Sequence, residues 1–185
     1  MFLRKLLRFL PRSPLGRALG ACNRGDFAVA AALFDDLLAA TPAPAADVVL
    51  YACEAHLECA RQREAAGDWS GALQSLERAI ALRPQWADVH LRAGRVHEQL
   101  DQPQRACEAY QRALAANPRY FAARLSLARL LMQLEDRAGA LRQLQEAAHS
   151  GPAYAAPQLA ELVSGLPEAS GAAARPPYPP FSMIT

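Results

Sequence analysis

A period of 34 residues constrains the fold of this chain more than any other feature, and it runs from Cys53 to Tyr154. Four sets of similar residues recur at this spacing: Pro84, Pro118 and Pro152; Ala72, Ala106 and Ala140; Ala79, Ala113 and Ala147; Trp86, Tyr120 and Tyr154. Two further sets recur in the other half of each unit: Leu57, Leu91 and Leu125; Arg61, Arg95 and Arg129. A period of this size is typical of stacked repeat arrays, which have no single central core.

Each unit reads as two helices joined by a turn, as residues 87–120 illustrate. The first half carries apolar residues at helical steps of three and four: Val89, Ala93, Val96 and Leu100. The segment Asp101–Pro103 interrupts this pattern, and its proline suits the first turn of a second helix. Pro118 ends that helix, because the residue before a proline is disfavoured in the helical region. The unit is therefore predicted to be a helical hairpin.

The spacing Ala106-x3-Tyr110-x2-Ala113-x4-Pro118 resembles the second half of a tetratricopeptide repeat. Gly94 stands where that family has the glycine of its Leu-Gly pair, whereas the other two units have alanine there. The first helices depart further from the family at the positions that often hold tryptophan or tyrosine: His56, His90 and Arg124; Arg63, His97 and Leu131. The resemblance implies an all-α fold, a right-handed α-α superhelix of about four hairpins with a C-terminal capping helix.

The domain organisation follows from this register. Residues 1–12 form a basic amphipathic segment, 13–44 a degenerate first hairpin and 45–154 three repeats, with boundaries at 53–86, 87–120 and 121–154. Eight additional residues separate the first hairpin from the repeats, which predicts a helix from Val48 to Ala66 that is about two turns longer than its counterparts. Residues 155–166 are predicted to form the capping helix and 167–185 a proline-rich disordered tail.

The resemblance also implies a binding site, because the first helices of tetratricopeptide arrays line a concave groove that often contacts an extended peptide. It places Leu57, Leu91 and Leu125 on the groove floor, with Arg61, Arg95 and Arg129 beside them. Arginine suits carboxylate recognition, since its planar fork makes two-point contacts. First helices about 10 Å apart would meet an acidic group at about every third residue of an extended ligand. The alternative is that Glu58, Glu64 and Glu98 pair with Arg61 and Arg95 within their helices, although Arg129 has Met132 at the equivalent place and no such partner.

No sequence motif indicates an enzyme, a metal site or a cofactor. The chain lacks a glycine-rich phosphate loop, a nucleophile elbow and a zinc-protease motif. Its histidines are predicted to be structural, and so are its cysteines: Cys22, Cys53, Cys59 and Cys107. The free thiols favour a reducing compartment such as the cytoplasm. A net charge of +2 does not favour nucleic-acid binding.

The sequence thus predicts a non-enzymatic scaffold or adaptor that binds an extended, partly acidic protein segment. Two alternatives remain open: a chaperone-like holder of one substrate protein, and a peripheral membrane assembly factor anchored by residues 1–12. Those residues are too few to span a bilayer but place Arg4, Lys5 and Arg8 on one face. This segment is expected to pack on the first hairpin, to contact an anionic membrane surface or to bind a partner.

The end of the tail offers a second candidate motif. Four apolar side chains stand among its prolines: Tyr178, Phe181, Met183 and Ile184. They indicate either an idle tail or a docking motif, and a docking motif could mediate self-association by entering the groove of a second copy.

Overall fold

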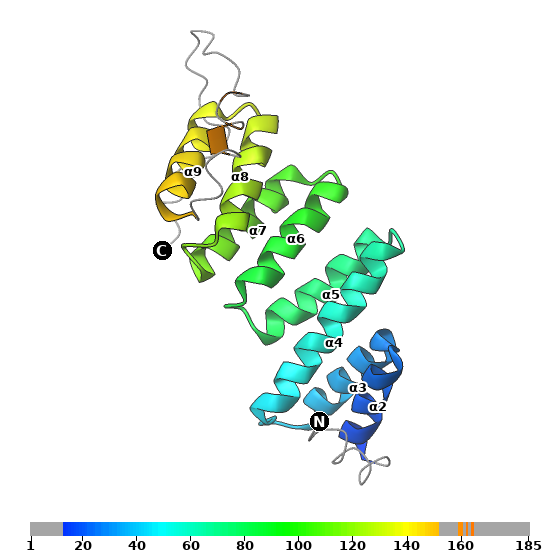
Figure 1. Ribbon diagram of the computed structural model, residues 1–185. Coiled ribbons are helices and arrows are strands. Elements are labelled where there is room, and N and C mark those ends of the chain that lie inside the picture. The colour runs from blue at the N-terminus through cyan, green and yellow to red at the C-terminus, as the bar shows by residue number, and fades with distance from the viewer. Residues whose placement is uncertain (1–12, 152–158, 161, 163, 165–185) are drawn as a thin grey trace.

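The computed structural model describes residues 13–151, 159, 160, 162 and 164. This part of the chain consists of eight helices without a strand. Their bounds are as follows: α2, Pro14–Arg24; α3, Phe27–Ala40; α4, Ala46–Ala65; α5, Trp69–Leu82; α6, Ala87–Gln99; α7, Pro103–Ala116; α8, Phe121–Gln133; α9, Arg137–Ser150. Figure 1 shows them as four hairpins stacked in chain order, from α2 and α3 at one end to α8 and α9 at the other. The predicted all-α helical repeat fold is confirmed.

Local sequence signals explain where the helices start. The Ser13 side chain accepts a hydrogen bond from the Gly16 N–H at 2.9 Å, and Pro14 occupies the first turn of α2. Asp68 and Asp136 each accept a backbone N–H at 2.9 Å at the starts of α5 and α9. These side chains satisfy N–H groups that have no partner within the helix.

Helix α4 is the longest, with 20 residues against 13 in α6 and in α8. The difference corresponds to about two helical turns, which is the extension expected from the eight additional residues before the first repeat. Its N-terminal part packs on the first hairpin through Ala52 and Ala55, whereas Cys53 and Ala60 belong to the next cluster along the array. The long helix therefore joins the divergent first hairpin to the regular repeats.

The buried side chains form three clusters along the array rather than one central core. The first contains Phe34, the second Leu76 and the third Tyr110 and Leu144, all of them at most 2% exposed. Alanine is the most frequent residue among the buried apolar side chains of the described part of the chain.

Most of the predicted capping helix lies outside the described residues. The positions that are described, 159, 160, 162 and 164, are helical. Leu159 is 8% exposed and packs into the third cluster, together with the partly buried Leu162. These two side chains therefore cover part of the last hairpin.

Candidate functional site

The first helices of the three repeats share an exposed surface that we call the first-helix face. We define it by five positions that recur on each helix: Glu54, Leu57, Glu58, Arg61 and Glu64 on α4; Asp88, Leu91, Arg92, Arg95 and Glu98 on α6; Ala122, Leu125, Ser126, Arg129 and Met132 on α8. The three repeated arginines are exposed. They point to solvent and are not enclosed between helix layers.

The repeated leucines lie below this surface. Leu91 is 4% and Leu125 8% exposed, and both belong to the third buried cluster. Leu57 is half-buried and packs against the second cluster. The leucines are thus largely covered, and the exposed side chains of the face are all charged: Glu54, Arg61, Asp88, Arg95 and Arg129.

The repeated arginines differ in their local partners. The Nε of Arg61 donates a hydrogen bond to the carboxylate of Glu58 on the same helix at 2.7 Å. Among the described residues, Arg95 and Arg129 form no ion pair and no hydrogen bond through their side chains. The expected alternative of pairing within a helix therefore describes Arg61 but not the other two arginines.

Glu64 and Glu98, which could have paired with arginines within their own helices, have other partners. Arg92 of α6 donates to Glu64 of α4 at 2.9 Å and to the carbonyl oxygen of Leu57 at 3.4 Å. Both side chains of this ion pair are about one quarter exposed, at 26% each. Glu98 accepts a hydrogen bond from the hydroxyl group of Tyr110. The pair between Arg92 and Glu64 also shows that the first-helix faces of α4 and α6 adjoin.

A pocket of about 500 Å³ lies where these faces meet. It is lined by residues of α4, α5 and α6: Glu64, Trp69, Arg92, Arg95, Val96, Glu98 and Gln99. Trp69 supplies apolar surface. Of the two arginines and two glutamates in the lining, only Arg95 has no hydrogen bond or ion pair with a described residue. This combination suits a ligand that presents both an apolar and an acidic side chain.

Two tyrosine hydroxyl groups hold carboxylates of α6 in place. Tyr110 of α7 donates to Glu98, and Tyr120, next to the start of α8, donates to Asp88. Burial and the Glu98 carboxylate raise the pKa of Tyr110 well above its ordinary value. Burial and the hydrogen bond to Asp88 raise the pKa of Tyr120 to about 12. Both hydroxyl groups therefore remain protonated donors at neutral pH.

The unusual first-helix column formed by His56, His90 and Arg124 has structural roles. His90 Nε2 donates to the carbonyl oxygen of Pro84 at 2.7 Å, and Arg124 donates to the carbonyl oxygen of Pro118, the equivalent proline one repeat later. Both residues thus stabilise the loop that precedes their own helix. The predicted structural assignment of the histidines is consistent with these contacts.

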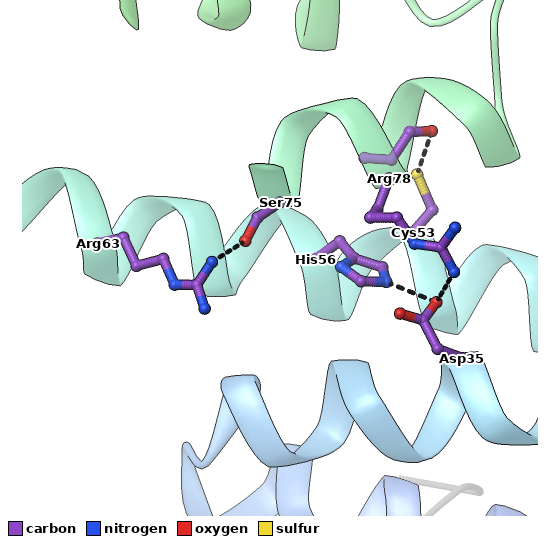
Figure 2. A network of polar contacts seen from close by, with 7 residues as sticks. Asp35, Cys53, His56, Arg63, Ser75 and Arg78 are labelled. Atoms are coloured by element: carbon purple, nitrogen blue, oxygen red, sulfur yellow. Dashed lines mark hydrogen bonds and ion pairs between the residues drawn. The ribbon is translucent and has the colours of Figure 1, made fainter. Parts of the chain in front are cut away.

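His56, the first member of this column, faces the divergent first hairpin instead. Figure 2 shows the Asp35 carboxylate of α3 between His56 Nε2, at 3.1 Å, and the Arg78 guanidinium of α5, at 2.8 Å. His56 is buried, with 4% exposure. Nearby, Arg63 donates a hydrogen bond to the Ser75 hydroxyl group at 3.1 Å. All five of these side chains line one pocket of about 470 Å³. This network joins three helices by polar contacts.

The described residues offer no evident metal centre or membrane span. No group of three or more His, Cys, Asp or Glu side chains in this part of the chain could hold a metal ion. Burial raises the pKa of the Cys53 and Cys107 thiols to about 11, which keeps both protonated at neutral pH. None of the described helices has the length and apolarity needed to cross a bilayer.

Two predicted contact regions lie outside the described residues. These are the basic side chains Arg4, Lys5 and Arg8 and the tail motif of Tyr178, Phe181, Met183 and Ile184. Both remain predictions.

Sequence reasoning missed Arg92 and Trp69, which line the pocket beside Arg95. The column of Arg92 holds Glu58 in the preceding repeat and Ser126 in the following one, so it gives no repeat signal. Trp69 follows Gly67 and Asp68, and no feature of the sequence places its ring beside α6.

Solved structures with a similar fold include three repeat proteins. TTC0263, a thermophilic tetratricopeptide protein of Thermus thermophilus, is 24% identical, with a TM-score of 0.51, over 87% of this chain and 87% of that chain. The TPR2B domain of yeast Sti1, in a complex with pHsp70, is 18% identical, with a TM-score of 0.56, over 60% and 93%. The first repeat domain of Spaghetti (RPAP3), bound to the HSP90 peptide SRMEEVD, is 14% identical, with a TM-score of 0.54, over 62% and 92%. At these identities the likeness concerns the fold.

No curated protein sequence matches this chain. The tetratricopeptide repeat family matches residues 59–121 and, in a second overlapping register, residues 91–158. Proteins of this family are typically non-enzymatic interaction modules. Together the two matches cover more than half of the sequence, and this chain belongs to the tetratricopeptide repeat family.

Proposed function

We propose that this protein is a non-enzymatic scaffold that binds an extended, partly acidic protein segment along its first-helix face. The observation that carries the proposal is that Arg95 and Arg129 are exposed and have no described partner. Both arginines are exposed on successive first helices, and neither forms an ion pair or a side-chain hydrogen bond with another described residue. Such a group can hold a carboxylate in two-point contact.

The surroundings of Arg95 support a peptide ligand over a small anion. The adjoining pocket of about 500 Å³ provides apolar contact through Trp69 beside the cation. An extended segment would place one side chain in this pocket and a second acidic group near Arg129, about three residues further on. The structurally similar domain of Spaghetti is bound to the peptide SRMEEVD, which carries acidic side chains. That precedent agrees with the chemistry proposed here.

Substitution of the two arginines tests this function. The probe is a fluorescent peptide of about 12 residues with two glutamates three positions apart and leucines between them, a length that spans three helices about 10 Å apart. Arg95→Ala and Arg129→Ala are each expected to weaken its binding about tenfold, because a hydrogen bond to a charged group contributes about 1.5–3 kcal/mol. Fluorescence anisotropy at low salt measures the affinities.

Arg112→Ala is the matched control. Arg112 lies on α7, a second helix, is 65% exposed and pairs with Glu108. Its loss changes the net charge by the same amount as the test variants but is expected to leave the affinity unchanged. An equal loss in all three variants would indicate a non-specific charge effect, and no loss in any of them would remove these arginines from the interface.

A further inference from the structure

The first-helix face changes in charge from one repeat to the next. On α4 it carries three acidic side chains, Glu54, Glu58 and Glu64, and one basic one, Arg61. On α6 two acidic side chains, Asp88 and Glu98, stand beside two basic ones, Arg92 and Arg95. On α8 the equivalent positions hold Arg129 and no acid. The face therefore runs from net negative through balanced to net positive in the order in which the helices stack.

Contacts within the protein leave one acidic side chain on α4 and one arginine on each of α6 and α8 without a described partner. Arg61 is paired with Glu58, and the ion pair of Arg92 with Glu64 joins α4 to α6. The two acids of α6 accept hydrogen bonds from tyrosines. The charged side chains of the face that have no hydrogen bond or ion pair with a described residue are thus Glu54, which is exposed on α4, and the arginines Arg95 and Arg129.

The charges on α4 and those on α8 act on a ligand independently of each other. First helices about 10 Å apart place α4 and α8 about 20 Å apart, which exceeds the screening length of about 8 Å at physiological ionic strength. A ligand charge therefore responds to the helix beside it and not to the whole face. A uniformly acidic ligand would be attracted at α6 and α8 but repelled at α4 by Glu54.

We infer that this face selects a protein segment with segregated charges and holds it in one orientation. The part of the segment beside α4 carries lysine or arginine, and the part beside α6 and α8 carries aspartate or glutamate. This inference rests on the proposed function and adds to it the charge order of the ligand. The acidic residues meet Arg95 and Arg129, and the basic residue meets Glu54.

Three synthetic peptides of about 12 residues test the charge order. The first has lysines in one half and glutamates in the other, the second has the same composition with the charges alternating, and the third has glutamates throughout. The segregated peptide is expected to bind at least about tenfold more tightly than the other two at physiological salt, as measured by fluorescence anisotropy. Equal or tighter binding of the uniformly acidic peptide would overturn the charge order while leaving the proposed function intact. Absence of binding by all three at about 1 mM would contradict both.

Charge reversal at each end tests the orientation. With the segregated peptide, Glu54→Lys is expected to weaken binding about tenfold, and replacing the lysines of the peptide with glutamates should remove this penalty. Arg129→Glu should show the matching behaviour with the acidic half of the peptide. Each variant is exposed and lies outside the buried clusters, so its fold can be checked by circular dichroism. If each variant couples equally to both halves of the peptide, the segment has no fixed orientation and the inference fails.

Discussion

The buried columns of the repeat and its first-helix face differ in how far they vary along the array. Ala72, Ala106 and Ala140 hold one buried column, and all three are 0% exposed. On the first-helix face, by contrast, one column changes from Glu58 to Arg92 to Ser126. Inside the stack every hairpin meets a neighbour of the same shape, so each repeat needs the same side-chain size. On the face each helix meets solvent and ligand, so its charge can differ.

The buried pair of Gly94 and Tyr110 departs from this uniformity and shows how the packing volume is conserved. A Cβ added at Gly94 would lie 2.4 Å from Cε1 of Tyr110. In the neighbouring repeats alanine occupies the glycine position, and leucine, as Leu76 or Leu144, occupies the tyrosine position. The smaller residue on one helix therefore accompanies the larger residue on the other, and the volume of the pair is conserved.

The largest effect is expected from a substitution that enlarges Gly94 while Tyr110 keeps its size. Gly94→Ala should lower the free energy of unfolding by about 2 kcal/mol, because the methyl group would overlap the ring of Tyr110. Adding Tyr110→Leu creates the pair found in the neighbouring repeats and should recover part of the loss. Urea unfolding followed by circular dichroism measures both.

The double-mutant cycle contains its own control. Tyr110→Leu alone removes the ring and its hydrogen bond to Glu98, and Tyr110→Phe separates these two losses. If the effects of Gly94→Ala and Tyr110→Leu simply add, the methyl group does not meet the ring, and the explanation by conserved volume is wrong.

A second, smaller effect is expected at the turns within the hairpins. Gly67, Asp101 and Glu135 are spaced by the repeat period and have φ angles of 76°, 55° and 61°. Left-handed backbone costs a residue with a Cβ about 1–2 kcal/mol, whereas glycine adopts it freely. Glu135→Gly should therefore stabilise the protein by about 1 kcal/mol, less the entropy that glycine adds to the unfolded chain.

Thermal unfolding of Glu135→Gly and of Gly67→Ala, its counterpart in the opposite direction, measures the effect of the turn. The first should raise and the second lower the midpoint. A lower midpoint for Glu135→Gly would show that the glutamate side chain has a stabilising contact that outweighs the backbone strain.

The contrast between the buried columns and the first-helix face also explains which features could be predicted from the sequence. The period and the prolines predicted the hairpins, and the start of α7 agrees with the prediction because Pro103 acts through the neighbouring backbone. The eight additional residues predicted the length of α4 because helical rise is constant. The partner of Glu64 was not predictable, since Arg92 lies on another helix in a column that does not repeat. Likewise, the burial of Leu91 depends on other helices of its own repeat and of the next one, which share its cluster, and not on its own helix.

The contact between the first hairpin and the repeats combines a buried apolar cluster with a polar network. Asp35 of α3 binds both His56 of α4 and Arg78 of α5. Burial alone would raise the pKa of Asp35, but the hydrogen bonds and positive charges of Arg78 and His56 outweigh it and hold the pKa below its ordinary value. The charged form of Asp35 is therefore the one that stabilises this joint.

The smallest effect is expected for Asp35→Asn. Its dependence on pH tests whether the charge of Asp35 holds the first hairpin to the repeats. At about pH 7 the substitution should cost up to about 1 kcal/mol, in line with a partly exposed ion pair. Since the folded-state pKa is lowered, the stabilisation is complete above the unfolded-state value of about 3.9 and is lost as the pH falls through the folded-state pKa. Urea midpoints of the wild type and the variant should therefore converge in acid, whereas Asp36→Asn, at an exposed neighbouring position, should match the wild type throughout. A gap for Asp35→Asn that persists in acid would mean that the shape of the side chain, and not its charge, holds the first hairpin to the array.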